Sequence, residues 1–212
     1  MADAGCTAAL SRPTGSTLRQ YEDDGYDLPR ADLGQLARCA QILAAVGGEV
    51  SERMLDRGYI DMLATLSATQ TLSSEVRSTA LAGVTNLMST CPGTAKSAAL
   101  ASCSMMKGVR AAFGTPNERG RQIALRFVHS CICGDDASNK QAVMDNNLGT
   151  AVGRLLAAPL LPPKERHTVL EIINSLAHVS SDFRKKLIVN DAKLVPNVEK
   201  LADPQWCGNF LL

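Results

Sequence analysis

The sequence has few aromatic residues. Phe, Trp and Tyr together make up 4% of its 212 residues and Trp occurs once, although hydrophobic residues reach 45%. β-Sandwiches favour aromatic and β-branched side chains, so this composition disfavours them. It favours helices that pack on helices through Ala, Leu, Val, Ile and Met. The predicted fold class is therefore all-α.

The sequence also lacks an excess of either charge. Its 22 basic and 21 acidic residues give a formal charge of +1, whereas nucleic-acid binders usually carry a concentrated basic field. No apolar run approaches the roughly 18 residues of a membrane span, and the first residues lack the basic flank and apolar block of a signal peptide. With an odd number of cysteines, seven, these features predict a cytoplasmic protein with no nucleic-acid partner and no membrane span.

Groupings typical of a catalytic or metal site are scarce. Only three histidines are present, and the most suggestive group is His129, Cys131 and Cys133. Residues two apart on a helix point about 200° away from each other, and two ligands do not make a structural zinc site. Residues 134–140 lack the terminal Glu of a calcium loop, and 114–120 lack the ending of a phosphate-binding loop. We expect no catalytic residues, no metal and no cofactor.

Four segments share a helical pattern. Each has a small or apolar residue at its first place and apolar residues one, four and seven places later, which is one face of an α-helix. The segments begin at Cys39, Ala80, Ala124 and Val169, with spacings of 41, 44 and 45 residues. Such a period predicts stacked helical repeats that share one core.

Each long helix is followed by signals for a short helix and a medium one. The residues expected to cap the short helices are Ser51, Thr94, Ser138 and Ser181. Turns that tolerate positive φ come next, clearest at 57–58 and 146–147. In the second repeat, 101–104 replace the turn glycine, so its short helix either runs on or bends there.

The order of long, short and medium helices in about 42 residues resembles the armadillo repeat. The phrases at 52–63 (ERMLDRGYIDML) and 76–87 (VRSTALAGVTNL) carry the resemblance best. It implies a right-handed α-solenoid of about four armadillo-like repeats over 31–203. The related HEAT repeats and a non-repetitive helical bundle are the alternatives. Residues 1–30 are expected to be a flexible tail, and 204–212 an apolar cap or docking segment.

The resemblance also implies a concave groove lined by the long helices. The residues that it places in this groove are Gln41, Ala82, Asn86, Arg119, Gln122, Arg126, Ser130, His167, Glu171, Ser175 and His178. Nuclear-import adaptors of this fold carry Trp and Asn at the groove positions in repeat after repeat. Only Asn86 fits that pattern, so import cargo is not expected.

The arginines of the third repeat indicate what the groove accepts. Arg119 and Arg126 favour an acidic helix or an acidic extended segment. The alternative is that the groove residues are only solvated and that the interface lies elsewhere. The candidate docking residues outside the groove are Tyr21, Tyr26, Trp206 and Phe210.

Together these features predict a non-enzymatic scaffold or adaptor that binds proteins and is a subunit of a larger complex. By analogy with short armadillo chains, that complex could be a cytoskeletal assembly such as a cilium or flagellum. The alternatives are a chaperone cofactor of the nucleotide-exchange type and a regulatory subunit of an enzyme. Fold alone does not decide among them.

Overall fold

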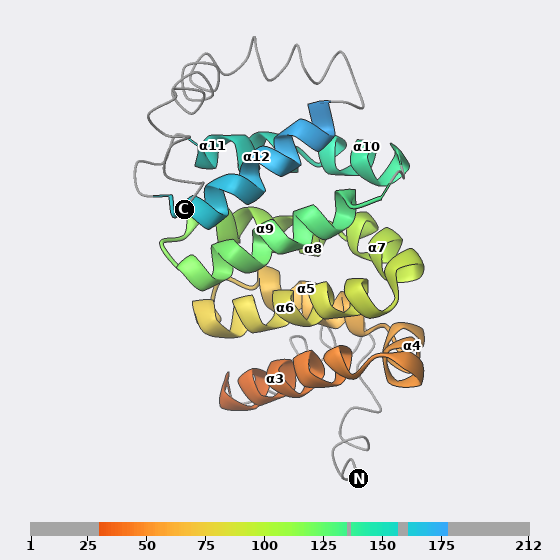
Figure 1. Cartoon of the computed structure of the whole chain (residues 1–212). Coiled ribbons are helices and arrows are strands. Elements are labelled where there is room, and N and C mark those ends of the chain that lie inside the picture. The colour runs from red at the N-terminus through yellow and green to blue at the C-terminus, as the bar shows by residue number, and fades with distance from the viewer. Residues whose placement is uncertain (1–29, 135–136, 157–160, 178–212) are drawn as a thin grey trace, which may run out of the picture. The chain divides into compact units, whose positions relative to one another are not determined.

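A computed structural model describes residues 30–134, 137–156 and 161–177, and every secondary-structure element in these ranges is an α-helix (Figure 1). The chain divides into two compact units, one up to Cys131 and one from Ile132 onward. The all-α prediction is confirmed. The expected tail at 1–30 and cap at 204–212 lie almost wholly outside the described residues, and the expected repeat region ends beyond them.

The first unit repeats one order of helices. A long helix, α3 (Arg30–Val46), is followed by the short α4 (Gly48–Asp56) and the medium α5 (Tyr59–Ala68). The same order recurs in α6 (Ser74–Thr90), α7 (Pro92–Ala101) and α8 (Cys103–Gly114). A third long helix, α9 (Glu118–Ile132), runs to the end of the unit. In Figure 1, α3, α6 and α9 lie one above another with their N-terminal ends on the same side.

Burial follows the predicted periodicity in α6 and α9, but not at the end of α3, where Val46 was expected in the core and is 65% exposed. The apolar side chains of α6 point into the core, where Leu81, Val84 and Leu87 are at most 1% exposed. Gly83 lies where α6 meets α3, and a Cβ atom there would stand 3.5 Å from the Cα atom of Gln41. Small residues thus let the long helices approach closely.

The second unit contains α10 (Ala137–Asp145), α11 (Leu148–Leu155) and α12 (Pro163–Ala177). Helix α11 contacts both α10 and α12. Most apolar residues expected from the periodicity are buried in α11 and α12: Leu148, Val152, Leu155, Val169 and Leu176. Leu170 and Ile173 were also expected in the core but are only half-buried, and Ile172 is fully buried in their place.

The predicted turns are confirmed at Gly58 and Asn147. Gly58 has a φ of 73° and Asn147 a φ of 57°, both in the left-handed region, and each stands directly before a medium helix. Glycine and asparagine adopt this conformation more easily than other residues.

The predicted caps are wrong. The serines at 51 and 138 and the threonine at 94 all lie inside helices, and Ser181 is outside the described residues. Helix α4 begins at Gly48, because Gly47 turns the chain with a φ of 76° immediately after α3. Helix α7 begins at Pro92, whose fixed φ suits the first helical position.

The second repeat bends at Ser102. Helix α7 ends at Ala101, and Ser102 adopts an extended conformation with φ −80° and ψ 110°. Its side-chain oxygen accepts a hydrogen bond from the amide of Met105 at 3.3 Å, so it caps α8. Of the two expectations for 101–104, the bend is correct, and it needs no residue with positive φ.

Candidate functional site

A cleft of about 230 Å³ lies on the three long helices of the first unit. It is lined by Gln41 from α3, by Ala82, Thr85 and Asn86 from α6, and by Arg119, Gln122, Ile123 and Arg126 from α9. Six of these eight residues are among those expected in the groove. Thr85 and Ile123 were missed, although their helical spacing of three from Ala82 and four from Arg119 places them on the same faces.

The cleft wall formed by α9 is positively charged. Arg119 and Arg126 are exposed and stand two turns apart on one face of the helix. No ion pair involves either of them in the described part of the chain, and no carboxylate lines the cleft. The Glu118 carboxylate accepts a hydrogen bond from the Gln122 side chain at 2.9 Å. The two guanidinium groups are therefore available to an acidic ligand.

Asn86 joins two walls of the cleft. Its side-chain amide nitrogen donates a hydrogen bond to the backbone carbonyl of Gln41 at 3.1 Å, so it bridges α6 and α3. The amide is thereby held in one orientation, and its side-chain oxygen remains as an acceptor at the cleft. A wall fixed before binding costs less ordering entropy when a ligand arrives.

Hydroxyl groups tie the same two helices together at the end of α3. Thr90 donates to the Ser51 hydroxyl at 3.0 Å, and Ser51 donates to the carbonyl oxygen of Ala44 at 3.3 Å. The last carbonyls of a helix have no intrahelical partner, and Gly47 has already turned the chain away. The buried Ser51 thus satisfies the end of α3 instead of capping α4.

A second hollow, of about 240 Å³, lies nearer the N-terminal ends of α3 and α6. Arg38 and Glu75 line it and form an ion pair at 2.6 Å, with both side chains more than half exposed. Thr79, also in this lining, precedes Ala82 of the main cleft by three residues. The hollow therefore continues the cleft along the same helix faces, but its charges neutralise each other.

The hollow and the cleft differ in charge because equivalent positions of the repeats hold different residues. Glu75 and Arg119 both stand five places before the start of their segment, and Arg38 and Thr79 both stand one place before. Between the first two long helices, these positions hold the ion pair between Arg38 and Glu75. The counterpart between the second and third holds Thr79 and Arg119, so Arg119 has no acidic partner at that position.

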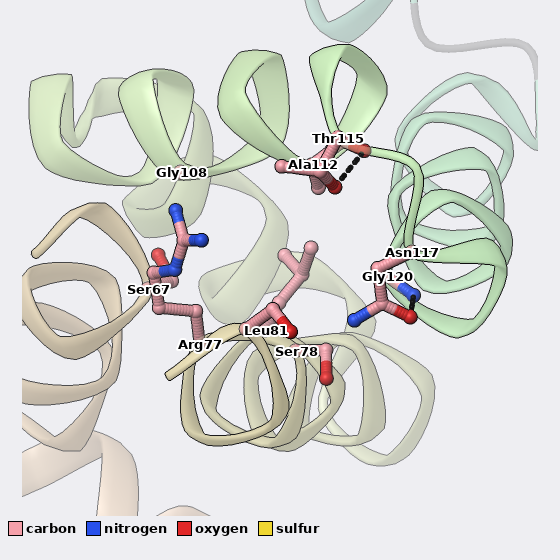
Figure 2. Close-up of a pocket in the computed structure, with 10 residues that line it drawn as sticks. Ser67, Arg77, Ser78, Leu81, Gly108, Ala112, Thr115, Asn117 and Gly120 are labelled. Atoms are coloured by element: carbon pink, nitrogen blue, oxygen red, sulfur yellow. Dashed lines mark hydrogen bonds between the residues drawn. The ribbon is translucent and has the colours of Figure 1, made fainter. Parts of the chain in front are cut away.

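A third cavity is too small for a ligand (Figure 2). It measures about 20 Å³ and is lined by residues from α5, α6 and α8, including Ser67, Arg77 and Gly108. A space of this size accommodates about one water molecule. The buried Nε atom of Arg77 has no hydrogen-bond partner among the described atoms. Close packing of Gly108 against Ser67 is the main feature of this region.

Comparisons with known proteins give structural matches only. No family model matches the sequence, and no curated protein matches it. Two crystal structures of engineered proteins, both targets of the Northeast Structural Genomics Consortium, are similar. The first has a TM-score of 0.63 at 17% identity over 84% of this chain and 68% of that chain. The second has a TM-score of 0.62 at 16% identity over 92% of this chain and 81% of that chain.

A designed armadillo repeat protein also matches, with a TM-score of 0.44 at 13% identity over 84% of this chain and 89% of that chain. This last match has no part in assigning the fold. The first unit itself repeats a long, a short and a medium helix, and its long helices α6 and α9 bury the same face. The chain therefore has an armadillo-like helical repeat fold.

The remaining groove candidates are not among the residues that line the cleft. Ser130 is half-buried on α9 and does not line it. In the second unit, His167 and Glu171 of α12 form a pair with Nε2 and Oε1 3.3 Å apart, and Ser175 follows four residues later. The candidates outside the described residues are Tyr21, Tyr26, His178, Trp206 and Phe210.

The cysteines and histidines offer no metal site in the described ranges. No group of three or more His, Cys, Asp or Glu side chains there is arranged to hold a metal ion. Burial raises the pKa of the Cys131 thiol to about 12, although Lys96 acts in the opposite direction. The thiol is thus protonated at neutral pH and contributes to packing. Among the described helices, none has both the length and the hydropathy needed to cross a bilayer.

Proposed function

We propose that this protein is a non-enzymatic interaction scaffold whose first unit binds an acidic, extended segment of a partner protein. The observation that carries the proposal is a cleft with two arginines that have no acidic partner in the described ranges, and with no carboxylate in its lining. Repeat folds of this kind use extended concave surfaces for binding. Charge-assisted hydrogen bonds from arginine to carboxylate are strong and directional.

The size and polarity of the cleft favour an extended segment over a helix. A helix with its side chains is about 10–12 Å across, whereas the cleft of about 230 Å³ matches only a few side chains. Gln41, Asn86 and Gln122 provide side-chain amides along it. Amides of this kind pair with the free backbone groups of an extended chain.

A binding assay with acidic peptides tests the proposal. The probes are fluorescein-labelled ten-residue peptides that carry two to four Asp or Glu residues, measured by fluorescence anisotropy against the full chain. The Arg119→Glu/Arg126→Glu variant should bind them at least about 10-fold more weakly, because each charge-assisted hydrogen bond contributes about 1.5–3 kcal/mol. Wild-type binding should also weaken as salt rises.

The matched control changes charge outside the cleft. Lys107 is exposed on α8 and does not line the cleft, so Lys107→Glu should leave binding unchanged. Equal binding by the wild type and the double variant would refute the cleft as the interface.

Affinity purification from the native source, followed by mass spectrometry, identifies the partner class. We propose a cytoplasmic scaffold that works within a larger complex, such as a cytoskeletal or ciliary assembly, and filament or axonemal proteins should then be enriched. Recovery of a heat-shock chaperone, together with faster nucleotide release on adding the purified protein, would instead indicate a chaperone cofactor. Stoichiometric recovery of one enzyme would indicate a regulatory subunit.

A further inference from the structure

We propose that the acidic segment 21–27 of this chain occupies the arginine cleft in the same molecule and competes there with partner proteins. This inference rests on the proposed function, because it assigns a first ligand to the same cleft. It is carried by charge complementarity and by the length of chain between the segment and α3.

The segment matches the chemistry of the cleft. Residues 21–27 read YEDDGYD, so four of the seven are acidic and none is basic, and no other stretch of the sequence is as densely acidic. Among the residues that the structure describes, neither cleft arginine has an acidic partner, and no carboxylate lines the cleft. Tyr21 adjoins Glu22, and a tyrosine ring packs favourably on an arginine side chain.

The connection has the required length. Helices α3, α6 and α9 lie in sequence with their N-terminal ends on one side (Figure 1). Two interhelical spacings of 8–10 Å separate α3 from α9, which makes about 20 Å. Arg119 is the second residue of α9, and Arg126 lies seven residues further on, about 10 Å along the axis.

An extended chain covers about 3.3 Å per residue. Asp24 stands six residues before Arg30, the first residue of α3, and Glu22 stands eight before it. Their reach is therefore about 20 Å and about 26 Å. With about 20 Å across the helices and about 10 Å along the axis, Arg126 lies about 22 Å away, so Asp24 reaches Arg119 and Glu22 reaches Arg126. The segment thus reaches the cleft without any change in α3.

Tethering makes even a weak contact effective. A ligand joined by a short linker experiences an effective concentration in the millimolar range. A segment with a dissociation constant of about 0.1 mM would then occupy the cleft about nine-tenths of the time. An incoming partner must displace it, so the apparent affinity of the cleft falls by about 10-fold.

The test uses the full chain with its acidic segment neutralised. The variant carries Glu22→Gln, Asp23→Asn, Asp24→Asn and Asp27→Asn. The probe is a fluorescein-labelled peptide with the sequence of residues 19–29, followed by anisotropy. We expect the neutralised chain to bind this probe about 10-fold more tightly than the wild type. Adding Arg119→Glu/Arg126→Glu to the neutralised chain should remove the binding.

A second variant controls for the change in net charge. It neutralises four exposed acidic residues of α4 and α5 that do not line the cleft: Glu49→Gln, Glu52→Gln, Asp56→Asn and Asp61→Asn. Its affinity for the probe should stay close to that of the wild type. An equal gain in both neutralised variants would show a general electrostatic effect and would overturn the proposal.

The outcomes separate this inference from the proposed function. Equal probe binding by the wild type and the segment variant overturns the inference, while the acidic-peptide panel can still support the cleft. Loss of all acidic-peptide binding to the segment variant refutes both. Masking that depends on protein concentration and accompanies a dimer in sedimentation would assign the segment to a second copy, and would overturn occupation within one molecule.

Discussion

Replacing Gly108 by alanine tests the packing that holds α5 against α8. A Cβ atom at position 108 would lie 2.2 Å from the hydroxyl oxygen of Ser67, 2.9 Å from its Cβ atom and 3.1 Å from its backbone carbonyl carbon. Ordinary contacts of a Cβ atom begin at about 3.4 Å. Figure 2 shows the two residues together at the small cavity.

The hydroxyl is able to rotate away, but the other two atoms belong to the backbone frame of α5. Rotation would also break the hydrogen bond that Ser67 donates to the carbonyl of Ala64 at 2.8 Å, a cost of about 1 kcal/mol. The remaining contacts require the helices to separate by about half an ångström, and overpacking of this kind costs about 1–3 kcal/mol.

Alanine also has an advantage over glycine inside a helix, of about 0.5–1 kcal/mol. The net expectation is that Gly108→Ala lowers the free energy of unfolding by about 2 kcal/mol. Urea titrations followed by circular dichroism should show a lower midpoint with an unchanged slope.

The matched control is the same substitution at Gly93 in α7. A Cβ atom there meets nothing within 4 Å, so Gly93→Ala should leave stability unchanged or raise it by up to about 1 kcal/mol. Opposite signs for one chemical change would isolate the contact with Ser67. If Gly108→Ala were as stable as Gly93→Ala, the argument from close approach would be wrong.

A second experiment exchanges the small residue between α8 and α5, so that position 67 becomes glycine and position 108 alanine. Ser67→Gly removes the hydroxyl and the Cβ atom, and leaves room for a methyl group at position 108. In the Ser67→Gly/Gly108→Ala double variant we expect a favourable coupling of about 1–2 kcal/mol. Additive effects would place the damage of the single variant elsewhere.

Three further predictions follow from individual side chains. Burial raises the pKa of the Cys131 thiol from 9.0 to about 12, so its contribution to stability is complete below pH 9 and declines above it. Relative to Cys131→Ala, unfolding titrations should show a loss of up to about 2 kcal/mol between pH 8.5 and 10.5. Thr90→Val removes the donor to Ser51 and should cost about 1 kcal/mol in the same assay; no loss would show that the hydroxyl is dispensable. The exposed pair of Arg38 and Glu75 should give a coupling of at most about 0.5 kcal/mol in a double-mutant cycle, and 1 M salt should remove it.

The sequence alone predicted the core faces of two long helices, α6 and α9. The pattern around Ala80 and Ala124 places one face of α6 and one face of α9 in the core, and both are buried as expected. Local turn chemistry was equally informative at Gly58 and Asn147, where the φ angles are positive. These features depend on residues close together in the sequence.

Features that depend on the neighbouring repeat were not predicted. Ser51 was expected to cap a helix, but its hydroxyl contacts the end of α3 and Thr90, 39 residues away. A serine near a helix start carries the same local signal in either role. The contact between Gly108 and Ser67 also joins two repeats, and a glycine inside a helical pattern does not reveal what lies opposite it.

The groove was predicted only in part: most of its lining residues followed from the sequence, but a hydrogen bond between its helices did not. Helical periodicity placed Gln41, Ala82 and Arg126 at equivalent positions, and all three line the cleft. It did not show that Asn86 is partly engaged by the backbone of α3, because that bond requires the spacing between helices to be known.

The charge of the cleft arises from a change in one inter-repeat pair. Between α3 and α6, the position five residues before the start of the shared helical pattern is Glu75. Arg38 of α3 forms an ion pair with it and neutralises its charge. Between α6 and α9, the same position is Arg119, and the position equivalent to Arg38 on α6 is Thr79, which carries no charge. Equivalent positions in the repeat therefore give a neutral hollow between α3 and α6 and a basic cleft beside α9. A repeat fold can acquire a binding site in this way, because stacking is maintained by the buried faces while the exposed positions are free to change their charge.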